Sequence, residues 1–199
     1  NDVTKQRGGF GYTFNQQSKY IEPFKKLLVK RKSNWYNLVR DFNLNLTPTL
    51  LSFRADVNRQ FGQFIPRIVS TDGTGKIERV DTTYDKYFTF DRFYNMRWDL
   101  SRSLNIDFSA TNNGRVDEPD GLLNTKQKKD TVWRNLLKGG RNTTYTQSAN
   151  FTYTLPTAKF PLLDWTTINV RYQAGYNWIG ASRLAVELGN IIENNQQSE

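Results

Sequence analysis

Apolar and polar residues alternate at every second position over much of this chain, and this period of two constrains its fold more than any other feature. The alternation runs through residues 50–61, 88–100, 104–111, 145–155 and 168–178. Successive side chains of a β-strand point to opposite faces of a sheet, so each segment predicts a strand with one apolar and one polar face. The sequence therefore predicts an all-β fold.

Two further segments bring the prediction to about seven strands. Residues 40–47 alternate in the same way, and Thr47-Pro48-Thr49 predicts a turn that joins them to residues 50–61 in a hairpin. Phe10, Tyr12 and Phe14 predict one more strand. Helical periodicity is confined to residues 35–39 and 184–192.

The connections between these strands alternate in length. Short ones are expected at Pro48, at Arg102 and over residues 156–164, and long polar ones over residues 15–39, 62–83 and 112–143. Short turns on one side and long loops on the other are typical of an antiparallel up-and-down barrel.

The composition favours a membrane barrel over a soluble sandwich. Of the 13 lysines only Lys86 falls at a predicted strand, whereas a soluble sheet usually carries lysine on its solvent face. Aromatic residues are 14% of the chain and gather at two depths, as in the aromatic girdles of membrane barrels. Arg59 and Arg92 interrupt the apolar faces about ten residues from the short turns, near the far interface, where a strand of about 9–11 residues has crossed the hydrocarbon. A mean hydropathy of −0.71 is compatible with such strands, because they average out as polar.

Seven strands are too few to close a membrane barrel, which needs about eight. We therefore expect residues 1–199 to be a fragment of one large outer-membrane β-barrel domain, an arc of about seven transmembrane strands. The start at Asn1 also suggests a piece of a longer chain.

The two parities of this barrel give two sets of candidate functional residues. The lipid-facing candidates are Phe42, Leu44, Phe53, Val57, Phe90, Tyr94, Met96, Trp98, Ile106, Phe108, Phe151, Tyr153, Val170, Tyr172, Tyr176 and Trp178. The pore-lining candidates are Asn43, Asn45, Arg54, Asp56, Asn58, Asp91, Asn95, Arg97, Asp99, Asn105, Asp107, Asn150, Asn169, Arg171 and Gln173.

Several segments together resemble the SprA/Sov family of outer-membrane proteins, over a stretch from about Gly8 to Gln196. They are residues 41–48, 51–59, 97–100, 107–113, 116–121, 153–156, 160–165 and 171–178. The resemblance implies the protein-conducting translocon of the type IX secretion system, which also serves gliding motility, and a location in the bacterial outer membrane. It implies secreted protein cargo, a smaller outer-membrane barrel that covers a lateral gate, and a periplasmic plug as partners.

Catalysis has little support. Cys and His are absent, which excludes thiol and imidazole nucleophiles, disulfides and Cys/His zinc sites. Carboxylate pairs are the remaining acid–base chemistry, but Arg54, Arg97 and Arg171 are expected on the same face, and charge pairing explains the acids better. The sequence thus predicts no enzyme, no cofactor and no metal.

Other binding functions stay open at this stage. The basic run at residues 25–32 could bind lipid phosphates or be a solvated loop, and residues 117–121 could bind calcium or form a turn. Nucleic-acid binding is disfavoured despite a net charge of +9, because the lysines lie in loops, away from the aromatic faces. The alternatives to a translocon are another large outer-membrane barrel, such as a nutrient transporter, or a soluble β-sandwich binding module.

Overall fold

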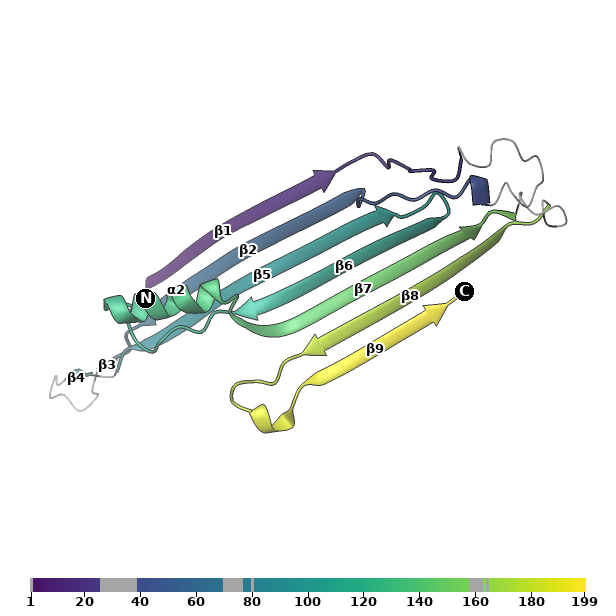
Figure 1. The fold of residues 1–199 in the computed structure, drawn as a ribbon. Coiled ribbons are helices and arrows are strands. Elements are labelled where there is room, and N and C mark those ends of the chain that lie inside the picture. Colours follow the sequence, from purple (N-terminus) through teal and green to yellow (C-terminus); the bar gives the residue numbers. More distant parts are fainter. Residues whose placement is uncertain (1, 26–38, 70–76, 80, 158–162, 164) are drawn as a thin grey trace. The chain divides into compact units, whose positions relative to one another are not determined.

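The fold was analysed in a computed structural model, which describes residues 2–25, 39–69, 77–79, 81–157, 163 and 165–199 (Figure 1). The predictions for residues 26–32 of the basic run, for most of residues 35–39 and for residues 158–162 and 164 lie outside this described part.

One antiparallel sheet of seven strands dominates the described chain, in the order β1-β2-β5-β6-β7-β8-β9, and neighbouring arrows run in opposite directions in Figure 1. The strands are β1 (Asp2–Asn15), β2 (Leu50–Phe64), β5 (Thr83–Asp99), β6 (Leu104–Arg115), β7 (Arg141–Leu155), β8 (Ile168–Ile179) and β9 (Ile191–Ser198). A two-stranded ribbon, β3 (Arg67–Val69) with β4 (Ile77–Arg79), lies within the β2–β5 connection. The all-β prediction is confirmed, while the sheet in the described residues is open, with β1 and β9 as its edges.

The helical elements whose bounds lie within the described residues include α2 (Lys126–Leu137) and the short 3-10 helix η2 (Val186–Leu188). Among the described residues, no helix is long and apolar enough to cross a membrane.

The predicted hairpin of residues 40–47 with 50–61 is wrong. Residues 41–49 form no strand and contain one isolated bridge, between Leu44 and Ile21. In the sheet, β2 lies between β1 and β5. Strand β1 is also longer than predicted and contains Lys5, a second lysine within a strand. Its three glycines interrupt the alternation, and at Gly9 a Cβ would come 2.7 Å from Asp56 Oδ1, so the bare backbone makes room for that carboxylate.

The C-terminal strand β9 was not predicted, and the helical periodicity of residues 184–192 overlaps only its first two residues. It reads Ile-Ile-Glu-Asn-Asn-Gln-Gln-Ser and shows no alternation, yet it pairs with β8 from Tyr172↔Ser198 to Ile179↔Ile191. Backbone hydrogen bonding forms this strand without any apolar pattern in β9 itself.

By compactness the described chain falls into two units, which are described separately. Unit 1 contains residues 1–10, 55–92 and 113–143, and unit 2 contains residues 11–54, 93–112 and 144–199.

Unit 1 is distinguished by α2, which lies within a connection predicted to be a polar loop. Thr125 caps its start by accepting a hydrogen bond from Lys128 N, and Gly139 and Gly140 end it with φ of +85° and +69°. A Cβ at Gly140 would lie 2.9 Å from Arg115 O, so both the backbone conformation and the space require glycine.

Residues 116–125 lead into α2, and Glu118 among them neutralises Arg59, which interrupts the apolar parity of β2. Arg59 from β2 forms a two-point ion pair with Glu118, with Nε–Oε1 at 2.5 Å and Nη2–Oε2 at 3.2 Å. The Glu118 side chain is 3% exposed and that of Arg59 22%. Lys86 donates hydrogen bonds to the carbonyls of Pro119 and Gly121. Val116 is 2% exposed. The segment is thus held by charge-assisted hydrogen bonds at its start.

In unit 2, the extended segment that was predicted to be a strand supports the β5–β6 turn instead. Asn43 Oδ1 accepts hydrogen bonds from Arg102 N at 2.8 Å and Ser101 Oγ at 3.2 Å. Asn45 N donates to Leu100 O, and Asn45 O accepts from the indole of Trp98 at 2.8 Å. Asn43 and Asn45 therefore hold the end of β5 and the turn that follows it in place through hydrogen bonds.

We predict that Glu118→Gln opens the segment leading into α2. The change removes the charge that pairs with half-buried Arg59, and a hydrogen bond to a charged group contributes about 1.5–3 kcal/mol. Amide hydrogen exchange at Val116 should accelerate by roughly tenfold to a hundredfold in the native protein. Asp130→Asn, which removes an exposed carboxylate of α2, should leave the exchange rate nearly unchanged. Equal protection in both variants would contradict the assignment.

Candidate functional site

The β7–β8 register separates the side chains into two faces. Directly opposed residues of neighbouring strands point to the same side of a sheet. The register therefore groups Tyr145, Ala149, Phe151, Tyr153 and Leu155 with Trp178, Ala174, Tyr172, Val170 and Ile168 on one side, where Gln147 opposite Tyr176 is the one polar residue of these pairs. On the other side it groups Thr146, Ser148, Asn150, Thr152 and Thr154 with Asn177, Gly175, Gln173, Arg171 and Asn169. We call these the apolar face and the polar face.

Aromatic contacts extend the apolar face along these strands. The rings of Phe151 and Tyr172 lie 6.1 Å apart, as do those of Tyr145 and Tyr176. Such pairs stabilise an antiparallel sheet beyond the area they bury. Six lipid-facing candidates, Phe151, Tyr153, Val170, Tyr172, Tyr176 and Trp178, share this face.

A broad apolar groove continues this surface within unit 2. Phe53 of β2 and Tyr94 of β5 pack with ring centres 5.2 Å apart. The groove has a volume of about 710 Å³, and its apolar lining is Leu51, Phe53, Tyr94, Met96, Phe108, Ala110 and Tyr145. Four lipid-facing candidates, Phe53, Tyr94, Met96 and Phe108, are therefore brought together.

A smaller cavity of about 180 Å³ is lined by polar residues of the opposite parity together with Leu50, Met96 and Phe108. Arg97 Nε lies 2.8 Å from Asp107 Oδ1, with both side chains exposed, at 61% and 44%. Asn95, Ser109 and Asn150 complete the polar lining. Four pore-lining candidates, Asn95, Arg97, Asp107 and Asn150, thus meet at one place.

Other members of the polar set have local partners. Ser18 Oγ donates to Asp99 Oδ2 at 2.9 Å, and Thr89 Oγ1 lies 3.4 Å from Asp91 Oδ2. The Arg54 guanidinium lies over the Phe93 ring, 5.9 Å from its centre. The roles of Asp56, Asn58, Asn105 and the other polar-face residues as a pore lining stay predictions, as do the lipid-facing roles of Phe90 and Ile106.

Four candidates need correction. Asn43 and Asn45 are 8% and 1% exposed and clamp the β5–β6 turn, which contradicts a pore-lining role. Phe42 and Leu44 lie outside the sheet, in the segment wrongly predicted to be a strand, so they are not part of a barrel wall. Val57 lies in the sheet and lines a cavity beneath α2, and its lipid-facing role stays a prediction.

The sequence also carried signals for α2 that we did not use. Lys129, Val132, Trp133 and Leu136 follow helical spacing, and Thr125 and the Gly139-Gly140 pair mark the two ends. Nothing in the sequence links Glu118 to Arg59, because the pair is made across 59 positions.

The acidic turn at residues 117–121 does not gather its carboxylates. Glu118 pairs with Arg59, Asp117 Oδ2 accepts from Arg141 Nε at 3.4 Å, and Gly121 has φ of +74°. No group of three or more acidic residues converges as a metal site among the residues that the structure describes. Of the basic run, Lys25 pairs with Glu22, and its hydrogen bond lowers the pKa of that carboxyl.

Comparison with protein families and with curated proteins identifies no relative of this chain. No protein-family model matches the chain, and no curated protein matches it significantly. Functional assignment therefore depends on the two faces of the sheet and on the sequence resemblance.

The exposed Arg97–Asp107 pair should orient side chains without stabilising the fold much. We predict a coupling free energy of about 0.2–1 kcal/mol in a double-mutant cycle of Arg97→Gln and Asp107→Asn, because solvent screens the two charges. The measurement is the free energy of unfolding in urea. A coupling well above this range would mean that the polar face is desolvated.

Proposed function

We propose that this chain forms part of the wall of a large outer-membrane β-barrel that conducts proteins, as in type IX secretion and gliding motility. The observation that carries the proposal is the β7–β8 register, which pairs apolar residues with apolar and polar with polar at ten of its twelve positions. The two mixed pairs are Gln147 with Tyr176 and Thr144 with Ile179. A barrel wall between lipid and an aqueous pore needs this separation.

The chemistry of the polar face supports passage of polypeptides. It combines amides with charges of both signs, as at Asn95, Arg97 and Asp107, and presents no ring of a single sign that would select an ion. The absence of His and Cys leaves this face without an imidazole base or a thiol, and the proposal includes no catalysis.

The assignment to a protein translocon comes from the resemblance to the SprA/Sov family. The cargo, the smaller barrel at a lateral gate and the periplasmic plug belong to the same proposal. A nutrient-transporter barrel would share the two faces but would conduct small solutes, and a soluble sandwich would bury its apolar face against protein.

The apolar face can be tested by charge insertion. Met96 lies five residues from the turn at Ser101, near the middle of a strand that crosses a membrane in about 9–11 residues. We predict that Met96→Arg costs about 2–4 kcal/mol and impairs assembly, because an arginine at the bilayer midplane loses its hydration. Asn95→Arg, on the polar face, should assemble normally, as judged by heat-modifiable migration of the full-length protein. Equal tolerance of both changes would argue against a wall in lipid.

The pore can be tested by thiol labelling of the full-length protein with any other cysteine removed. Cysteine at Asn105 or Ser109 should react with a water-soluble maleimide, whereas cysteine at Ile106 or Phe108 should not, because the reactive thiolate forms in water. Cargo trapped in the channel should protect the first two positions. Labelling of both parities would favour the soluble sandwich, and correct parity without protection by cargo would favour a nutrient transporter.

A further inference from the structure

We propose that the cavity beneath α2 binds an anionic phospholipid of the surrounding leaflet, with an acyl chain in the cavity and the phosphate at Lys129. The inference rests on the proposed position of the sheet in a membrane. It assigns a role to α2 and to the basic residues that the proposed pore does not use.

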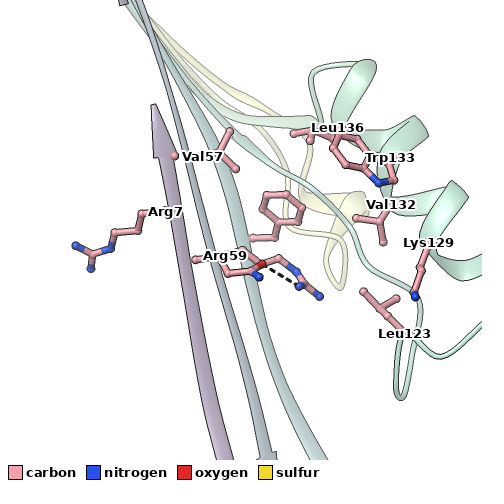
Figure 2. Close-up of a pocket in the computed structure, with 11 residues that line it drawn as sticks. Arg7, Val57, Arg59, Leu123, Lys129, Val132, Trp133 and Leu136 are labelled. Atoms are coloured by element: carbon pink, nitrogen blue, oxygen red, sulfur yellow. Dashed lines mark hydrogen bonds between the residues drawn. The ribbon is translucent and has the colours of Figure 1, made fainter. Parts of the chain in front are cut away.

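The cavity has the size and lining of a site for an apolar chain. Its volume is about 520 Å³, within the range of about 300–1,000 Å³ that is typical of ligand sites. Val57 comes from β2, while Val132, Trp133 and Leu136 come from α2 and face the strands across the cavity (Figure 2). Phe88 and Leu123 complete the apolar lining. Each methylene group that leaves water for such a lining gains about 0.8 kcal/mol.

The charges around the cavity select an anion. Arg59 is already neutralised by Glu118, and the Arg7 side chain points away from the cavity in Figure 2. Lys129 also lines the cavity, and among the described residues it forms no ion pair. It is therefore the cation available to a phosphate beside the apolar cavity.

The rest of the helix suits a position at a membrane surface. Between residues 126 and 138 there are five basic residues and one acidic residue, so an anionic headgroup layer attracts the segment. Trp133 is 63% exposed and Leu137 83%, which is unusual for large apolar side chains unless lipid or protein covers them. Tryptophan and leucine on a basic helix are typical of helices that lie in the interface.

The position along β2 is consistent with this depth. Arg59, beside the cavity, lies nine residues beyond Leu50, the first residue of β2. A tilted strand crosses the hydrocarbon in about 9–11 residues, so this part of β2 reaches the far interface, where phosphates are found.

Photo-crosslinking in the full-length protein tests the site directly. The photoreactive residue p-benzoylphenylalanine is placed at Trp133, and the protein is embedded in nanodiscs of equimolar phosphatidylglycerol and phosphatidylcholine. Mass spectrometry of the peptide that carries residue 133 gives the ratio of the two lipid adducts. We expect phosphatidylglycerol to be enriched about fivefold, the effect of one cationic side chain near an anionic lipid.

Matched substitutions identify the cation. Lys129→Gln should remove most of the enrichment, whereas Lys126→Gln, which makes the same charge change outside the cavity, should leave it largely intact. An adduct ratio near one, or a ratio that Lys129→Gln does not lower, would overturn the inference.

A second crosslinking position separates this inference from the proposed function. The same photoreactive residue at Phe108, in the groove of the apolar face, should capture lipid if the sheet lies in a membrane. Lipid adducts at Phe108 with a protein adduct or none at Trp133 would overturn the lipid site and leave the barrel wall standing. An absence of lipid adducts at both positions would overturn the barrel wall, and the lipid site with it.

Discussion

Cross-strand register is the constraint on which the rest of this structure depends. The β7–β8 pairing sets Phe151 opposite Tyr172 and Asn150 opposite Gln173, and a slip of one residue would mix the two faces. Backbone hydrogen bonds alone would allow many registers. The separation of apolar from polar side chains makes one of these registers preferable.

In unit 1, Arg59 interrupts the apolar parity of β2. Arg59 would be costly on an apolar surface, but Glu118 reaches it from the segment that precedes α2 and neutralises it. A half-buried pair of this kind gains little net stability over two apolar residues, whereas loss of one partner is expensive. The pair therefore fixes where the segment begins, and α2 follows from that point. Helix α2 supplies Lys129, the cation that the proposed lipid site uses.

Prediction from sequence succeeded where a strand carries its own alternation. Strands β5, β6, β7 and β8 were found for this reason, with bounds that differ mainly at their outer ends. Residues 40–47 alternate equally well but clamp a turn, because the edge of β2 was taken by β1. Strand β9 was missed because the backbone of β8 forms it, and its side chains show no pattern. The helix α2 was missed because only four residues, Lys129, Val132, Trp133 and Leu136, form its amphipathic stripe.

The sequence by itself determined that the chain is a sheet with an apolar and a polar face, and which residues of each alternating strand share a face. These properties are local, since the geometry of a single strand fixes them. Only the tertiary structure decided which strands are neighbours, that Asn43 and Asn45 are buried, and that Glu118 meets Arg59. Those outcomes depend on contacts between residues far apart in the chain, whose free energies no local pattern records.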